Sequence, residues 1–153
     1  MNPRIGALLL LALCLCEWPV FGFEPSSAQH TMYQIHCRHR AQYGLSPQKL
    51  DPGLCGLAQK LADAQAYHGY MAHSANLGYL ENVAHGVDPS GTIAMWIGSS
   101  AHNANLLSSA EYVGFGYSGI CGASLHGPAY SGADFVVTLG GGGRARRGLF
   151  RRR

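Results

Sequence analysis

The sequence contains few charged residues: Lys, Arg, Asp and Glu make up 12% of its 153 residues, whereas hydrophobic residues make up 47%. A chain with so little charge and so many apolar residues is expected to fold compactly, and its length suits one domain. Basic residues are especially scarce between residues 24 and 143, where there are four of them and seven acidic ones. The body of the chain is therefore mildly acidic, which excludes a generally basic domain.

The positive charge is concentrated in residues 144–153, which hold six arginines and no acidic residue. We expect this segment to be disordered, after a flexible glycine linker over residues 140–143. It can hold the protein on an anionic surface, such as lipid, a cell-wall polymer or nucleic acid, or it can be a solvated tail. Phe150 is its one aromatic residue, so specific recognition of nucleic acid is not expected.

Long hydrophobic runs are absent, apart from one near the start. Residues 1–22 combine Arg4, an apolar run and a final Gly22, which is the pattern of a secretory signal peptide. The run is short and is soon followed by Glu17 and Pro19, which argues against a membrane span, although an uncleaved anchor is the alternative. The sequence therefore predicts a secreted protein, extracellular or periplasmic, whose domain occupies residues 23–143.

Cysteines are also few, because only Cys37, Cys55 and Cys121 follow the predicted signal peptide. An exported protein meets oxidising conditions, so a disulfide is expected. Cys37 and Cys55 are the preferred pair, since they lie on two predicted helices joined by a short turn. Closing their loop of about 18 residues would stabilise the fold by about 3 kcal/mol. Cys121 would then be left over, and the alternative is that all three cysteines are reduced.

Hydrophobic periodicity predicts both helices and strands. Helices are expected over residues 29–43, 54–73, 88–97 and 100–107, and strands over residues 80–84, 112–117 and 133–139, of which the last has the strongest signal. The sequence predicts a loop over residues 120–132. The second helix has the clearest apolar face, on which we expect His68 to be a core histidine. We expect this helix to continue past Gly69 and to end near His73.

His73, Glu81 and His102 are the candidate functional residues. They lie at a predicted helix end, after a short loop and in the first turn of a later helix, so they can converge in space. Two imidazoles with a carboxylate or water suit zinc. The chain lacks a tighter metal motif, such as a histidine pair four residues apart on a helix. With eight histidines in the chain, scattered surface histidines are the alternative.

The order of several short motifs resembles the CAP superfamily, which comprises the cysteine-rich secretory, antigen 5 and pathogenesis-related 1 proteins and is also called the SCP-domain family. The resemblance is greatest to its bacterial branch. It implies an α+β fold, a three-layer α-β-α sandwich. The matching motifs are His73-Ser74, Gly78-Tyr79-Leu80-Glu81-Asn82, Trp96, Ser99 with His102, Asn105-Leu106-Leu107, and Val113-Gly114-Phe115-Gly116.

The resemblance also implies a site. In the animal and plant branches a central cleft is lined by two histidines and two glutamates, and the histidines can hold a divalent metal such as zinc. His73, Glu81 and His102 match three of these four positions, so His73 and His102 are the expected metal ligands. The second glutamate is replaced by Ser99, which removes one carboxylate. Asn82 is expected to support the cleft.

Two functions follow from this resemblance. The first is a secreted CAP-domain protein that binds a divalent metal and a lipid-like, sterol-like or protein ligand without turnover. The second is a zinc-assisted hydrolase in which Glu81 is the general base. A serine nucleophile is not favoured, because no glycine-x-serine-x-glycine motif surrounds Ser99 or Ser100. Cys37 as the nucleophile of a thiol protease is less favoured still, since a bridge or core packing is expected for it.

Overall fold

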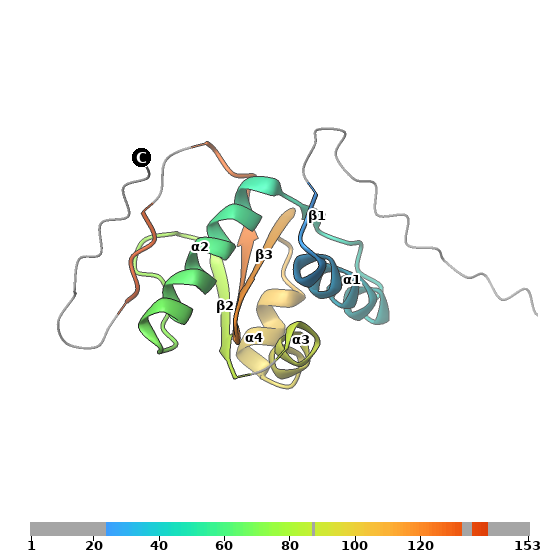
Figure 1. Ribbon diagram of the computed structural model, residues 1–153. Coiled ribbons are helices and arrows are strands. Elements are labelled where there is room, and N and C mark those ends of the chain that lie inside the picture. The colour runs from blue at the N-terminus through green and yellow to red at the C-terminus, as the bar shows by residue number, and fades with distance from the viewer. Residues whose placement is uncertain (1–23, 87, 133–135, 141–153) are drawn as a thin grey trace, which may run out of the picture.

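The structure is a computed structural model, which describes residues 24–86, 88–132 and 136–140. A four-stranded sheet lies between helices on both of its faces (Figure 1). One face carries α1 (Ser27–Gln42), α3 (Pro89–Ile97) and α4 (Ser100–Leu106), and the other carries α2 (Pro52–His68). The strands, in spatial order, are β1 (Lys49–Leu50), β3 (Tyr112–Ser118), β4 (Cys121–Gly127) and β2 (Leu80–His85). This arrangement confirms the predicted α-β-α sandwich.

Helix starts are marked by side chains that cap exposed backbone N–H groups. Ser26 and Gln29 form a reciprocal capping box at the start of α1, in which each side chain accepts the other residue's N–H. Asp51 and Asp88 accept N–H groups from the first turns of α2 and α3, and a proline follows each of them. These local signals explain why the predicted start of α3 is confirmed.

The end of α2 differs from the prediction. Gly69 adopts a left-handed conformation with φ of 68°, and its N–H donates to the carbonyl of Gln65. This is a common way for a helix to end, so α2 stops at His68 and does not reach His73. The prediction that His68 is a core residue is wrong, because its side chain is exposed. His73 lies in the following loop, so the helix dipole does not act on it.

The last third of the chain also departs from the prediction. Residues 121–127, expected to be a loop, form the inner strand β4, which pairs antiparallel with both β2 and β3. Residues 136–138 form no strand, and Leu139 makes a single bridge to Ser74. Residues 133–135 of the predicted strand lie outside the described residues. Strand formation here depends on position between two neighbours, which overrides the propensity of the segment itself.

Close contact between α2 and β3 fixes the second layer. A Cβ atom on Gly114 would lie 2.1 Å from the carbonyl carbon of Leu54, and one on Gly116 would lie 2.2 Å from the carbonyl carbon of Ala58. Only glycine therefore allows the helix to lie directly on the strand. The predicted strand over residues 112–117 is confirmed as β3, and its glycines are the reason that α2 can pack so closely on it.

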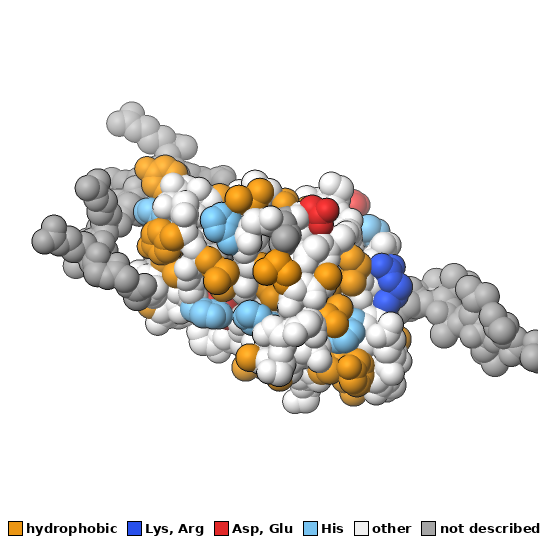
Figure 2. Space-filling view, turned by 90° about the horizontal axis from the view of Figure 1, so that it is seen from below, with side chains coloured by type: hydrophobic (Ala, Val, Ile, Leu, Met, Phe, Trp, Pro, Cys, Tyr) orange, Lys and Arg blue, Asp and Glu red, His pale blue; other side chains and the backbone are white. Residues whose placement is uncertain are grey.

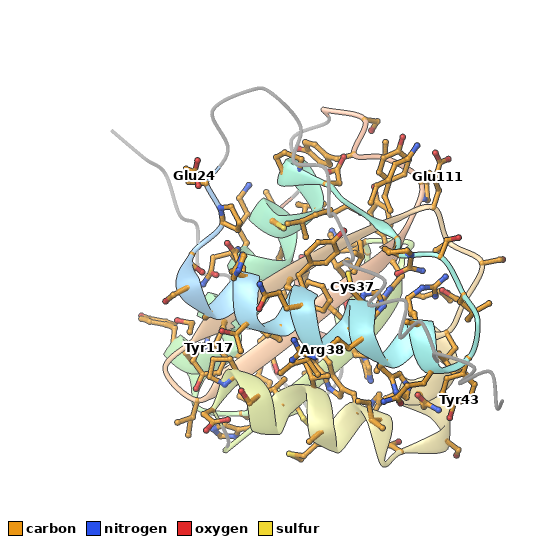
Figure 3. All side chains as sticks on the ribbon, turned by 90° about the vertical axis from the view of Figure 1, so that its right-hand side faces the viewer. Glu24, Cys37, Arg38, Tyr43, Glu111 and Tyr117 are labelled. Atoms are coloured by element: carbon orange, nitrogen blue, oxygen red, sulfur yellow. The ribbon has the colours of Figure 1, made fainter. Side chains whose placement is uncertain are left out.

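The predicted disulfide between Cys37 and Cys55 is wrong, because no disulfide joins any cysteines among the described residues. Cys37 lies on α1 (Figure 3) and Cys55 on α2, and these helices cover opposite faces of the sheet instead of forming a hairpin. Both side chains are buried in the core, as is that of Cys121. Burial raises the pKa of the Cys55 thiol to about 12, which makes it unreactive.

Several sequence predictions fall on parts of the chain that the structure does not cover. The predicted signal peptide (residues 1–22) and the arginine segment (residues 144–153) lie outside the described residues. Within the part that is described, no helix has the length and hydropathy needed to cross a membrane.

Candidate functional site

Glu81 on β2 is the centre of the candidate site. Its Oε1 atom lies 2.7 Å from Nδ1 of His73 and accepts the backbone N–H of Ser74 at 2.9 Å. Its Oε2 atom accepts the hydroxyl of Ser74. The side chain of Glu81 is only 8% exposed, whereas that of His73 is 60% exposed. The carboxylate is thus largely buried, and it holds an imidazole at the surface.

This contact sets the role of each nitrogen of His73. Because an ionised carboxylate can only accept hydrogen bonds, Nδ1 carries the proton and donates it to Glu81. Nε2 is then the nitrogen with an available lone pair. A histidine whose second nitrogen donates to a carboxylate is the usual form of a metal-ligating histidine.

His102 lies in the first turn of α4 and is half-buried. Its pKa is lowered, mainly because partial burial disfavours the charged ring and also because His73 is close enough to repel a second positive charge. The two predicted metal ligands are therefore close enough for their charges to interact. The structure also keeps His102 in the neutral form that a metal requires at neutral pH.

Two asparagines hold α4 against β2. The side-chain amide of Asn82 donates to the carbonyl of His102 at 3.2 Å. The amide of Asn105 donates to the carbonyl of Glu81 at 3.2 Å and to the side-chain oxygen of Asn82 at 2.9 Å. Asn82 thus supports the site. Asn105 was not predicted as a site residue, although its place three residues after His102 was a usable signal.

Trp96, which lies on α3, also holds β2 in place. Its ring N–H donates to the carbonyl of Val83 at 3.1 Å, and the side chain is buried. Trp96 and Asn105 thus donate hydrogen bonds to the backbone carbonyls of Val83 and Glu81 on β2, which is an edge strand of the sheet. Capping an edge in this way fixes the strand that carries Glu81 and discourages pairing with another chain.

Ser99 occupies the position where the family resemblance suggested a second carboxylate. It is the N-cap residue of α4, but its side chain makes no capping hydrogen bond. Among the described residues, no group of three or more His, Cys, Asp or Glu is arranged to hold a metal ion. The available donors are thus the imidazoles of His73 and His102. Such a pair fits an exchangeable ion with open positions, and not a closed structural zinc site.

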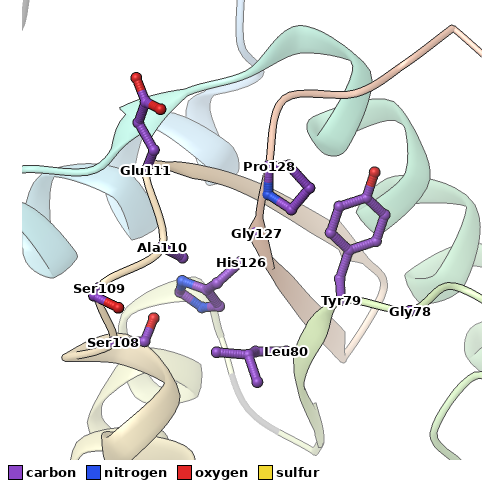
Figure 4. A pocket seen from close by; sticks show the side chains of 10 residues that line it. All are labelled: Gly78, Tyr79, Leu80, Ser108, Ser109, Ala110, Glu111, His126, Gly127 and Pro128. Carbon is purple, nitrogen blue, oxygen red and sulfur yellow. The ribbon is translucent and has the colours of Figure 1, made fainter.

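A separate pocket of about 480 Å³ lies where β2 and β3 begin and β4 ends (Figure 4). It is lined by Gly78, Tyr79, Leu80, Ser108, Ser109, Ala110, Glu111, His126, Gly127 and Pro128. None of the predicted site residues lines it, although Leu80 is the neighbour of Glu81 on β2. The pocket is therefore adjacent to the candidate site along the chain and is not part of it.

Sequence reasoning missed a second set of histidines, which is buried. Nδ1 of His126 donates to the side-chain oxygen of Gln48 at 2.7 Å, and its Nε2 accepts from the hydroxyl of Ser124 at 3.0 Å. Nε2 of His36 lies 3.1 Å from the carbonyl of Leu106 and donates to it. The alternation of Ser124 and His126 would have indicated this set, had the segment been recognised as a strand.

Burial controls the charge of these two histidines. It lowers the pKa of His36 to about 4, with a smaller contribution from the positive charge of Arg40. It also lowers the pKa of His126 well below the usual value. Their rings contact each other edge to face, with centroids 5.6 Å apart. Both are therefore neutral at physiological pH and act as structural hydrogen-bonding residues.

Comparison with known proteins identifies a family that the chain matches. The family model "CAP: Cysteine-rich secretory protein family" matches residues 33–130. An outer surface protein from Borrelia burgdorferi has a similar fold, with a TM-score of 0.62 at 15% identity, covering 71% of this chain and 97% of that one.

Two other solved structures are similar in fold. An extracellular protein containing an SCP domain from Bacillus anthracis matches with a TM-score of 0.57 at 17% identity, covering 65% of this chain and 40% of that one. A cysteine-rich secretory protein from Staphylococcus aureus matches with a TM-score of 0.52 at 16% identity, covering 72% and 40%. No curated protein sequence matches the chain. Since the family model spans well over half of the chain, the chain belongs to the CAP family of cysteine-rich secretory proteins.

Proposed function

We propose that this CAP-domain protein is secreted and binds a divalent cation, such as zinc, through His73 and His102, together with a small lipid-like or protein ligand, without turnover. The observation that carries the proposal is the contact between Nδ1 of His73 and the buried carboxylate of Glu81. This contact orients the ring and reserves its Nε2 for a ligand. The predicted signal sequence supports secretion.

The hydrogen bonds of Glu81 favour binding over hydrolysis. A general base must have a free lone pair within reach of the water that it deprotonates. Both oxygens of Glu81 already accept hydrogen bonds, one from His73 and both from Ser74. Ser99 supplies no carboxylate that could replace it. The chain therefore has histidines to bind an ion, but no described carboxylate that is free to activate water beside them.

A bound zinc ion would supply a Lewis-acid centre with open positions for a ligand oxygen or nitrogen. His73 and His102 would hold it, and Glu81 would keep the His73 ring in the required orientation. Asn82 would keep the backbone of His102 at its place beside β2. The neighbouring pocket is shallow and open to solvent, and it offers Leu80 and serine hydroxyls as contacts for a ligand.

The test is a calorimetric titration of the purified secreted form of the chain with zinc. We expect one site, and we expect His73→Ala and His102→Ala each to weaken it by more than about tenfold, and Glu81→Gln by about ten- to a hundredfold. His30→Ala, a histidine on α1, is the matched control and should leave the affinity unchanged. Equal affinity in the wild type and in both site variants would refute the proposal. Zinc-dependent turnover of ester or peptide substrates that Glu81→Gln abolishes would instead establish a hydrolase.

A further inference from the structure

The loop between α2 and β2 carries His73 and is hydrogen-bonded to residues 136–140, which we call the C-terminal strap. The N–H of Gly140 donates to the carbonyl of His73 at 2.6 Å, and the N–H of Ala75 donates to the carbonyl of Thr138 at 2.8 Å. A Cβ atom on Gly140 would lie only 3.1 Å from the carbonyl oxygen of His73, so glycine suits this close approach. The strap is thus paired with the backbone of a proposed cation ligand.

Ser74 joins the strap to Glu81. Its backbone forms a bridge with Leu139, while its N–H and its hydroxyl donate to the carboxylate of Glu81. His73 donates to the same carboxylate through Nδ1. Two elements therefore hold this short stretch, because Glu81 binds the ring of His73 and the strap binds its backbone.

The strap is anchored by its own side chains. Val137 and Leu139 are half-buried and pack against the core cluster that α2 forms with the sheet, whereas Val136 and Thr138 are exposed. This alternation is that of an extended chain with one face on the core. Asn76 adds exposed side-chain bonds to the backbone of Val136 and Thr138, at the other end of the strap from its contact with His73. Burial of the two apolar side chains therefore docks the strap.

The loop has few other restraints near His73. Among the described residues, the two hydrogen bonds that residues 70–77 make between their backbone and other backbone groups both go to the strap. Leu77 is the one buried side chain of this stretch, and it lies four residues after His73. The pairing with Gly140 is therefore the contact that fixes the backbone of His73 most directly.

The strap lies at the left of Figure 1, beside the loop that follows α2. Seen from below, this half of the molecule shows hydrophobic and histidine side chains, whereas lysine and arginine appear only at the right-hand edge (Figure 2). The described basic side chains in that view therefore lie on the side opposite the strap, where they would not repel a cation held by His73.

We propose that the C-terminal strap is the positioning element of the cation site. By holding the backbone of His73, it places the ring where Nδ1 reaches Glu81 and Nε2 is presented to the cation. The inference rests on the proposed function, since it concerns the same two histidines, and it adds a dependence on residues more than 60 positions along the chain. Because coupling between two equilibria is reciprocal, a bound cation would in turn stabilise the docked strap.

The variant Gly140→Pro tests the pairing in the secreted form of the chain, because proline has no N–H to donate to His73. Calorimetric titration should show an affinity for zinc that is reduced by about tenfold or more. The nitrogen NMR signals of the His73 ring report which nitrogen carries the proton, and the proton should no longer be held on Nδ1 alone. Val136→Ser, a change at a strap side chain that is 75% exposed, is the matched control and should alter neither result.

A second variant removes the anchors of the strap and not its pairing groups. Val137→Ser with Leu139→Ser should lower the affinity for zinc and release the proton of the His73 ring as Gly140→Pro does. Circular dichroism establishes first that the double variant is folded; Gly140→Pro, which keeps both anchors, decides the question if it is not. In the wild type, zinc should slow hydrogen exchange at the amide of Gly140.

A double-mutant cycle separates positioning of His73 from a general loss of stability. In the His73→Ala background, zinc binding that remains can be followed through the NMR signal of His102. Gly140→Pro should leave that remaining binding unchanged, because the strap acts through His73.

Two results would overturn the proposal. The first is an unchanged affinity for zinc together with an unchanged His73 ring in Gly140→Pro. The second is a further loss of zinc binding when Gly140→Pro is added to His73→Ala, which would indicate general destabilisation. A wild type that binds no zinc would instead refute the proposed function; loss of the Nδ1 proton in Gly140→Pro would then still establish that the strap positions His73.

Discussion

The two pairs of histidines in this protein differ in what surrounds them. His36 and His126 are fully buried and bonded to fixed groups of the protein, and their pKa values are lowered. His73 is exposed and is held through one nitrogen by Glu81, while His102 is half-buried beside it. The first pair stabilises the fold, and the second pair is the one that we propose binds a ligand. The surroundings of each pair therefore distinguish a structural role from the proposed binding role.

The buried pair should matter most for stability. His126→Ala removes the partners of Gln48 and Ser124 in the interior and leaves a cavity there. We expect the free energy of unfolding to fall by about 4 kcal/mol, the sum of unpaired polar groups and lost packing. Denaturant unfolding measures it. In the same experiment His73→Ala should cost no more than about 1–2 kcal/mol, because Glu81 loses one hydrogen bond but still accepts two from Ser74; a similar loss in both variants would remove the distinction between the pairs.

The buried pair should also make the protein sensitive to acid. His36 has its pKa lowered from 6.5 to about 4, so below pH 6.5 the unfolded chain binds a proton that the folded chain refuses. The free energy of unfolding should therefore fall as the pH is lowered from 6.5 to 4, by about 3 kcal/mol for this residue. His126 acts in the same direction. Burial is the main cause of the lowered pKa of His36, and repulsion by Arg40 and His39 is a smaller part of it.

Unfolding midpoints measured across this pH range provide the check. The variant His36→Gln should show a shallower loss of stability on acidification than the wild type. If His36→Gln kept the full slope, the loss of stability would have to come from other titrating groups.

A smaller loss of stability is expected from a change at the contact between α4 and β2. Asn105 joins α4 to β2 by donating to Glu81 and Asn82. Asn105→Ala should cost about 1–2 kcal/mol of stability, and it should also weaken zinc binding because His102 is no longer held at a fixed distance from Glu81. Asn76→Ala, which loses exposed hydrogen bonds to the backbone of Val136 and Thr138, is the control. Loss of stability with unchanged zinc affinity would show that α4 is positioned by other contacts.

Local signals in the sequence predicted a large part of this structure. Asp88 followed by proline predicted the start of α3, Gly98 its end, and Ser99 or Ser100 the start of α4, of which the structure has Ser99 as the N-cap. Each of these depends on the hydrogen bonds or the backbone angles of a few neighbouring residues. The order of the motifs also brought Glu81 and the two site histidines together. Such features could be predicted because their physical cause is local.

The features that could not be predicted depend on distant residues. β4 is a strand because β2 and β3 lie on both sides of it, and no periodicity in its own residues shows this. Gly69 ends α2, although the apolar pattern continues beyond it. The buried role of His126 follows from its contact with Gln48, which is 78 residues away in the sequence. The two histidine pairs differ in how deeply they are buried, and burial could not be predicted because it depends on the folded structure.

The difference between the histidine pairs can be tested directly by recording the side-chain NMR signals of all eight histidines during a titration with zinc. We predict that the signals of His73 and His102 shift or broaden first and together. Those of His36 and His126 should stay unchanged while the protein remains folded. Unchanged signals of His73 and His102 at saturating zinc, or an earlier change at His36 and His126, would contradict the assignment of the surface pair as the ligand-binding site.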